Sequence, residues 1–269
     1  MEKDIGVGLS VSAVSWSPTD NKLAIGTTSG FLCIIDSETQ QQEVYTQIHL
    51  YRIISVCWSP DGTQVVCIFS DRTLCIWDNK GSVLTDDIRG VRDLDLLKSF
   101  TLSWRPGELI FCDSEGVALV LDPKTCEKIC TRFQPPLSIL SPNGKEFASR
   151  KADRLSVWNS KTRQQSHTFS PCTGCSIAWS PKGKRLASTS NMGISVWEPG
   201  TDNVTHIHGF ARAFWDIAWS PDGNRMASVS INNSVIIFSR YGGDCLDVVS
   251  CQFHETVLSQ CRERDSRLR

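Results

Sequence analysis

A short motif centred on a proline, preceded by serine in five of its six copies, recurs along the chain and constrains its fold more than any other feature. Its copies read SWSPTD, CWSPDG, SWRPGE, ILSPNG, AWSPKG and AWSPDG, with anchor residues Trp16, Trp58, Trp104, Leu140, Trp179 and Trp219. Successive anchors lie 36 to 46 residues apart, and each is followed 17 to 19 residues later by a second mark such as IWD or VWN. A period of this length indicates repeated units that bury their hydrophobic faces against their neighbours.

Each unit is predicted to contain four short antiparallel strands. The segment before an anchor alternates large and small side chains, as from Ile54 to Trp58 and from Trp215 to Trp219, which is typical of a strand with one buried face. Proline and a following glycine then predict a tight turn. Two more strand-like segments and a polar stretch such as EVYTQI complete the unit. In this register Ile54, Trp215 and Cys175 are expected in the core.

Units of about 40 residues with these two marks resemble the repeats of the WD-repeat β-propeller family. The resemblance covers residues 10 to 250 and implies an all-β fold, a β-propeller of about six four-stranded antiparallel blades. An incomplete seven-bladed ring is the alternative. Residues 1–250 are expected to form the propeller, and residues 251–269 a partial blade or a charged C-terminal tail.

In that family, a His, an Asp, a Ser and the Trp of the second mark form a buried hydrogen-bond network. The resemblance implies that His49, Asp71 and Trp77 form this network in the second repeat, although Cys67 occupies the serine position. The later repeats have the serine but lack the aligned histidine: Ser149, Ser188 and Ser228. Contact between blades is therefore expected to be mostly apolar.

The composition narrows the class of protein. The 269 residues are 40% hydrophobic and carry a formal net charge of -1, so no overall field draws the chain to nucleic acid or to an anionic membrane. The start, MEKDIGVGLS, lacks the pattern of a signal peptide. We expect a protein of the cytoplasm or nucleus, with its 12 cysteines reduced.

The sequence predicts neither an enzyme nor a bound cofactor. The sequence contains no GxSxG, GxxxxGK[ST], HExxH or GxGxxG motif. Zinc is the sharpest metal hypothesis, since cysteines and histidines lie in spaced pairs: Cys126 and Cys130, Cys172 and Cys175, His206 and His208. Because Cys175 is expected in a core position, no metal site is predicted.

The function predicted is a non-catalytic interaction scaffold that binds a protein or peptide on one rim of the propeller. Aromatic and basic residues just before the first strands are the candidate contacts: Tyr51, Arg52, Lys98, Phe133 and Arg212. A small-molecule ligand is not expected. Two alternatives stay open: a substrate receptor of a cullin-type ubiquitin ligase, because IWDNK at residues 76–80 resembles the WDxR/K box, and a propeller domain accessory to an enzyme. The acidic stretch between Asn79 and Phe100 is a further candidate for a partner contact.

Overall fold

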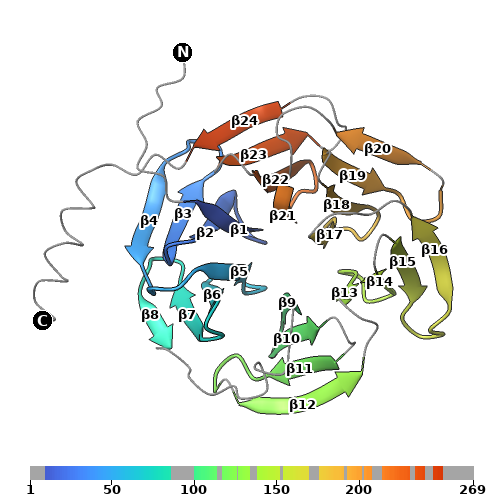
Figure 1. Cartoon of the computed structure of the whole chain (residues 1–269), viewed down its shortest axis with the longest axis horizontal. Helices are drawn as coiled ribbons and strands as arrows, with labels where there is room; N and C mark the ends of the chain where they lie inside the picture. The colour runs from blue at the N-terminus through green and yellow to red at the C-terminus, as the bar shows by residue number, and fades with distance from the viewer. Residues whose placement is uncertain are drawn as a thin grey trace, which may run out of the picture.

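A computed structural model shows six four-stranded antiparallel sheets arranged as a ring (Figure 1). The structure describes residues 10–85, 100–113, 117–125, 127–133, 138–151, 154–169, 176–190, 193–201, 203–207, 214–230, 234–239 and 245–250. Each sheet is one blade, made of four consecutive strands. Within the described residues, no helix is long and apolar enough to cross a membrane.

The blades follow the chain order, and the first strand of each is innermost. Blade 1 holds β1 (Val11–Trp16), β2 (Lys22–Thr27), β3 (Phe31–Asp36) and β4 (Gln42–Gln47), and blade 2 holds β5 (Ile53–Trp58), β6 (Gln64–Phe69), β7 (Leu74–Asp78) and β8 (Val83–Thr85). Blade 3 holds β9 (Phe100–Arg105), β10 (Glu108–Asp113), β11 (Val117–Leu121) and β12 (Lys128–Phe133), and blade 4 holds β13 (Ser138–Leu140), β14 (Glu146–Lys151), β15 (Arg154–Asn159) and β16 (Gln165–Phe169). Blade 5 holds β17 (Ile177–Trp179), β18 (Leu186–Ser190), β19 (Gly193–Trp197) and β20 (Val204–Ile207), and blade 6 holds β21 (Phe214–Trp219), β22 (Arg225–Ser230), β23 (Ser234–Ser239) and β24 (Cys245–Ser250).

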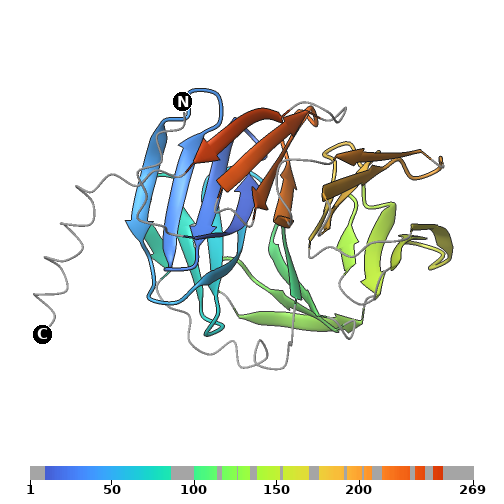
Figure 2. The same ribbon diagram turned by 45° about the horizontal axis from the view of Figure 1, so that its top comes forward.

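This up-and-down order gives the ring two distinct faces, seen obliquely in Figure 2. The turns after the first and third strands of every blade lie on one face, which we call the turn face. The turns after the second strands and the connections between blades lie on the other, which we call the connector face. Both repeated sequence marks lead into the turn face, because each anchor ends a first strand and each second mark ends a third strand.

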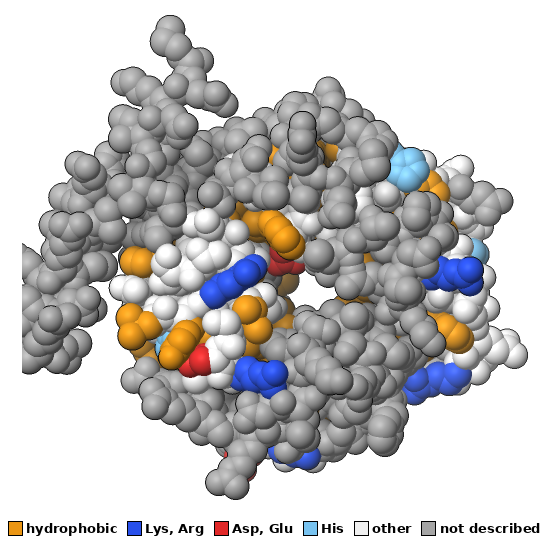
Figure 3. All heavy atoms as spheres, viewed as in Figure 1, with side chains coloured by type: hydrophobic (Ala, Val, Ile, Leu, Met, Phe, Trp, Pro, Cys, Tyr) orange, Lys and Arg blue, Asp and Glu red, His pale blue; other side chains and the backbone are white. Residues whose placement is uncertain are grey.

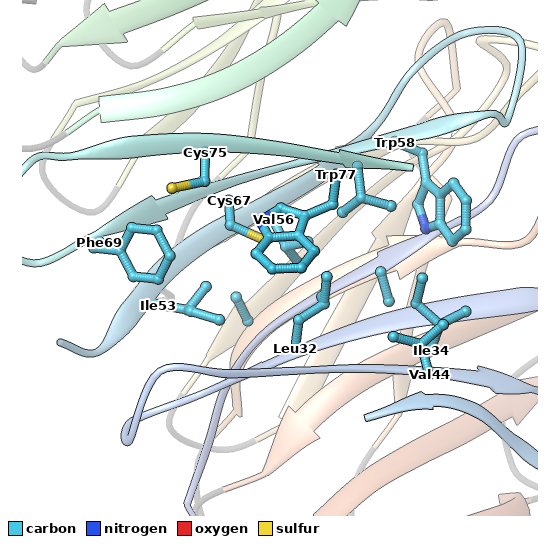
Figure 4. Close-up of a cluster of buried hydrophobic side chains, with 13 residues drawn as sticks. Leu32, Ile34, Val44, Ile53, Val56, Trp58, Cys67, Phe69, Cys75 and Trp77 are labelled. Atoms are coloured by element: carbon cyan, nitrogen blue, oxygen red, sulfur yellow. The ribbon is translucent and has the colours of Figure 1, made fainter. Parts of the chain in front are cut away.

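The core lies between blades rather than within them, because the faces of neighbouring sheets pack against one another. Figure 4 shows one such cluster, in which Leu32 and Ile34 of blade 1 meet Val56, Trp58 and Phe69 of blade 2. Equivalent buried clusters join blades 2 and 3, 4 and 5, 5 and 6, and 6 and 1. The expectation that apolar contact joins the blades agrees with this arrangement.

Several anchor tryptophans also tie neighbouring blades by a repeated hydrogen bond. The indole Nε1 of Trp58 donates to the backbone oxygen of Ser15 at 3.1 Å, in the preceding blade. Trp179 and Trp219 make the equivalent bonds to the blades before them, also at 3.1 Å. In each case the acceptor is the backbone oxygen of the residue just before the anchor of the preceding blade. The same hydrogen bond therefore recurs from one repeat to the next.

The junction between blades 6 and 1 closes the ring, and it is built differently. Trp16 Nε1 is buried there with no hydrogen-bond partner among the described residues. Its ring instead faces the Arg225 guanidinium at 5.2 Å, a cation–π contact. The carboxylate of Asp216 completes the junction, since Oδ2 accepts from the Val14 backbone N–H of blade 1 at 3.0 Å and Oδ1 accepts from the Ser176 hydroxyl of blade 5 at 2.8 Å. Six blades therefore form the ring, and the seven-bladed alternative does not apply.

The predicted placement of Ile54 and Trp215 in the core is wrong. A β-bulge interrupts the register near the start of β5 and of β21, between Ile53 and Ser55 and between Phe214 and Asp216. The residue inside each bulge turns outward, so Ile54 is 38% exposed and Trp215 is 46% exposed. Ile53 and Phe214 fill the core in their place. Cys175 lies outside the described residues.

Candidate functional site

The connection between blades 1 and 2, residues 48–52, is the best-described part of the connector face. Its backbone is fixed to the turn after β2, because the N–H groups of Ile48 and His49 both donate to the oxygen of Gly30, at 2.9 and 3.2 Å. Gly30 has a φ of 76°. A Cβ at this position would collide with the backbone of His49 and lie 2.8 Å from the oxygen of Tyr51. Glycine therefore permits the close approach that holds the connection in place.

The turn between β6 and β7 supports the connection from the other side. The Ser70 N–H donates to the backbone oxygen of Arg52 at 2.8 Å. Within this turn, the Asp71 carboxylate accepts bonds from the Thr73 N–H and hydroxyl at 3.1 and 2.7 Å. Arg72 adopts a φ of 68°. Residues 48–52 are thus held on both flanks by hydrogen-bonded turns, which makes their exposed side chains a preorganised surface.

The implied network in blade 2 is assembled only in part. His49 Nε2 lies 3.8 Å from Asp71 Oδ2, and His49 Nδ1 accepts from the Tyr51 N–H at 3.2 Å. Trp77 does not join them, since its Nε1 is buried without a hydrogen-bond partner in the described part of the chain. Cys67 occupies the position that would supply an acceptor, and its side chain lies in the same apolar cluster as Trp77 (Figure 4).

Blade 4 shows what that position does when a serine fills it. The Trp158 Nε1 donates to the Ser149 hydroxyl at 2.9 Å. The spacing from this serine to its tryptophan matches the spacing from Cys67 to Trp77 in sheet register. The cysteine therefore accounts for the unsatisfied indole in blade 2.

Exposed apolar side chains gather on this fixed connection. Leu50 is 81% exposed and Tyr51 is 52% exposed, and the bulged Ile54 follows on the adjoining strand. Arg52 is also exposed and has no ion pair among the described residues. In Figure 3, hydrophobic and basic side chains lie next to one another over blades 1 and 2. We call Leu50, Tyr51, Arg52 and Ile54 the connector patch.

The other predicted contact residues cannot be placed beside this patch. Lys98 and Arg212 lie outside the described residues, as does the acidic stretch from 86 to 99. Phe133 ends β12, but its side chain is not described. Lys80 of the IWDNK segment is exposed on the turn face, where its N–H donates to Asp78 Oδ1 at 3.0 Å. The structure therefore brings together Tyr51 and Arg52 from the predicted set.

The patch also contains residues that the sequence analysis missed. Leu50 was overlooked because it falls outside both repeated marks, although it sits in a connection that carries the predicted Tyr51 and Arg52. Alternation of side chains predicts Ile54 in the core, because strict alternation cannot reveal a bulge. Ile53 and Ile54 are adjacent large apolar residues, and this break in the alternation of side chains is the sequence feature that fits a bulge.

The described residues offer little for covalent or metal chemistry. Burial raises the pKa of the Cys57 thiol to about 11 and that of Cys67 well above its usual range, so both remain protonated and weakly nucleophilic at neutral pH. Among the described side chains, no group of three or more His, Cys, Asp or Glu could hold a metal ion. His206 of the zinc hypothesis is exposed and contacts the Ser195 hydroxyl at 3.0 Å. The feature of the described residues that suits binding is the exposed connector patch.

A ring of six such sheets with repeated tryptophan ties defines the class of protein as a β-propeller. Comparison with protein families places three segments, residues 41–78, 158–198 and 202–239, in the WD domain, G-beta repeat family. Each segment runs from the outer strand of one blade, or the end of the strand before it, through the inner three strands of the next. These three segments of the six-bladed ring are therefore WD repeats.

Curated relatives agree with this assignment. The chain is similar to the "WD repeat-containing protein WDS homolog" of Arabidopsis thaliana, with 31% identity over 55% of this chain and 29% of the relative. It is similar to "WD repeat-containing protein 1" of Bos taurus and Mus musculus, with 27% identity over 52% and 51% of this chain and 22% of each relative. The chain thus spans less than a third of the length of these relatives.

Proposed function

We propose that this chain is a non-catalytic interaction scaffold and that a peptide segment of a protein partner binds its connector patch. WD-repeat propellers typically act as protein-interaction scaffolds. The observation that carries the proposal is the exposure of Leu50, Tyr51 and Ile54 on a backbone held by turns on both flanks. Large apolar groups on a water-facing loop gain stability only when something covers them.

The composition of the patch indicates the kind of segment it fits. Tyrosine and arginine are enriched at the centres of protein interfaces, because they combine a large contact area with a polar end. A preorganised backbone lowers the ordering cost of binding. We therefore expect an extended peptide with one apolar anchor residue, which covers Tyr51 and Ile54, and one acidic residue that pairs with Arg52.

To test this proposal, a peptide ligand is first selected against the purified chain, and its binding site is then located with variants. Peptides are selected from a random displayed library, synthesised with a fluorescent label and titrated by anisotropy against the wild type and against Tyr51→Ala/Arg52→Glu. Truncation of a central interface residue costs about 2 kcal/mol, which corresponds to a loss of affinity of about 30-fold. We expect the double variant to show at least that loss.

A control variant carries the same kinds of substitution away from the connector patch. Lys80→Glu/Val83→Ala also reverses one charge and truncates one exposed apolar residue, but Lys80 lies on the turn face and Val83 starts the outer strand β8. This control should bind as the wild type does. Equal weakening in both variants, or no weakening in the connector-patch variant, would refute the proposed site.

A further inference from the structure

The opposite side of the ring carries a second feature that the connector patch does not explain. Five exposed basic residues occupy the turn face of blades 4 and 5: Lys145, Lys161, Arg163, Lys182 and Lys184. None of them has an ion pair within the described part of the chain. We call these five residues the basic arc.

Contacts between turns place these residues side by side. The turn after β17 packs against the turn after β13, because a Cβ at Gly183 would lie 3.0 Å from Asn143 Nδ2 and 3.7 Å from Pro142 Cδ. The turn after β15 joins them, because the Ser160 hydroxyl donates to the oxygen of Gly144 at 2.7 Å and the Ser160 N–H donates to that of Lys145 at 2.8 Å. The arc is therefore continuous across the junction of blades 4 and 5.

The backbone that carries the arc is well fixed. The Lys145 N–H donates to Asn143 Oδ1 at 2.9 Å, and the Lys161 N–H donates to Asn159 Oδ1 at 2.9 Å. The Gly183 N–H donates to the oxygen of Ser180 at 2.8 Å, which closes the turn between Lys182 and Lys184. Hydrogen bonds thus fix the backbone beneath these side chains, and the Arg163 guanidinium lies over the Phe147 ring at 5.7 Å.

Acidic groups do little to neutralise this region. In the described parts of blades 4 and 5 the acidic residues are Glu146 and Glu198. Glu198 is already engaged by Arg185, whose Nε and Nη2 lie 2.7 and 2.6 Å from Oε1. Glu146 is half-buried at the start of β14. The arc consequently keeps an excess of positive charge in a chain whose formal net charge is -1.

The same face is acidic elsewhere, which limits what can bind the arc. Exposed carboxylates occupy turns of blades 1, 2 and 6: Glu38, Asp61 and Asp222. Hydrogen bonds from its own turn, led by the Ser59 hydroxyl, lower the pKa of Asp61, so it is ionised at neutral pH. A long nucleic acid or a flat anionic membrane laid across the face would meet these charges. Asp222 borders the arc, because a Cβ at Gly223 would lie 3.5 Å from Pro181 Cδ. A short acidic segment that stays on blades 4 and 5 avoids Glu38 and Asp61.

We propose that the basic arc is a second interaction surface, which binds an acidic peptide segment of a protein partner. The proposal does not depend on the connector patch, because the two surfaces lie on opposite faces of the ring. A chain with both would hold two partner segments at once. Because the contacts are exposed ion pairs, binding at the arc should weaken steeply as salt rises.

Fluorescence anisotropy tests this with the full chain and a labelled peptide in which glutamates alternate with serines. A peptide with glutamine in place of glutamate is the ligand control. Lys182→Glu/Lys184→Glu should weaken binding of the glutamate peptide at least tenfold, and the glutamine peptide should not bind. Both substitutions are at exposed side chains, so the melting temperature should stay that of the wild type.

The matched protein control is Lys80→Glu/Lys124→Glu, which changes the net charge equally but acts at blades 2 and 3 of the same face. It should keep wild-type affinity. The proposal is overturned if the glutamate peptide does not bind, or if the two double variants lose affinity equally. Tighter binding of a DNA duplex or of phosphatidylserine vesicles, with the same dependence on Lys182 and Lys184, would overturn the assignment to an acidic peptide.

Discussion

Asp216 offers the sharpest test of how the ring is closed. Its carboxylate accepts one hydrogen bond from blade 5 and one from blade 1, through the Ser176 hydroxyl and the Val14 N–H. In Asp216→Ala both of these donors lose their acceptor, as does the neighbouring Ile217 N–H, which donates to Oδ1 at 2.9 Å. A buried donor left unsatisfied costs about 1–3 kcal/mol. The two donors from neighbouring blades set an upper range of about 2–6 kcal/mol for the stability that the blade junctions lose.

The carboxylate itself reduces this figure. Burial raises the pKa of Asp216 above its ordinary value, which means that the folded state pays a desolvation penalty for the charge. Removing the carboxylate relieves that penalty, so we expect a net loss of about 2–4 kcal/mol. Asp216→Asn keeps one acceptor oxygen and should lose about half as much.

Equilibrium urea unfolding, followed by tryptophan fluorescence, measures these differences. Asp20→Ala is the control, because its carboxylate makes only a 3.3 Å bond and a 3.9 Å ion pair with its neighbour Lys22. That variant should stay within about 0.5 kcal/mol of the wild type. An Asp216→Ala chain as stable as the Asp20→Ala chain would refute the role of this carboxylate in joining three blades.

Three further predictions concern single residues. Gly30→Ala should lower the free energy of unfolding by about 2 kcal/mol or more in urea titrations, because its positive φ and the adjoining backbone leave no room for a Cβ; an unchanged midpoint would contradict this. Cys67→Ser should supply the missing acceptor for Trp77 and raise stability by about 1 kcal/mol in the same assay, and a loss of stability would show that the indole gains nothing from the hydroxyl. Because the pKa of Asp61 is lower in the folded than in the unfolded chain, the unfolded chain takes up the Asp61 proton first as the pH falls. The ionised carboxylate therefore adds stability above about pH 4, and this contribution is lost as the pH falls further. Thermal melts should therefore show a shallower acid dependence for Asp61→Asn than for the wild type, and parallel curves would count against it.

The repeat made most of the fold predictable from the sequence. Anchors such as Trp58 and Trp219 are buried, lie at the ends of first strands, and bond to the preceding blade. Their position follows from patterns of apolar side chains and turn residues, which are local properties of the chain. Six copies of a local pattern then leave few arrangements that cover every sheet on both sides.

The parts that escaped prediction depend on contacts between distant residues. Alternation alone placed Ile54 and Trp215 in the core, because a bulge shifts the register without leaving a distinct residue type behind. The role of Gly30 depends on the connection that crosses it some 20 residues later along the chain. The basic arc is assembled from three separate turns of two consecutive blades, and only their packing shows that the charges meet.

Hydrogen exchange with mass spectrometry tests the central claim, binding at the connector patch, most directly. Amide exchange of the chain is compared with and without a saturating peptide selected against it. We predict slower exchange in residues 48–54 and in the supporting turn at residues 70–73, with the turn face of blades 4 and 5 unchanged. Protection confined to other blades, with residues 48–54 exchanging as in the free chain, would contradict the account.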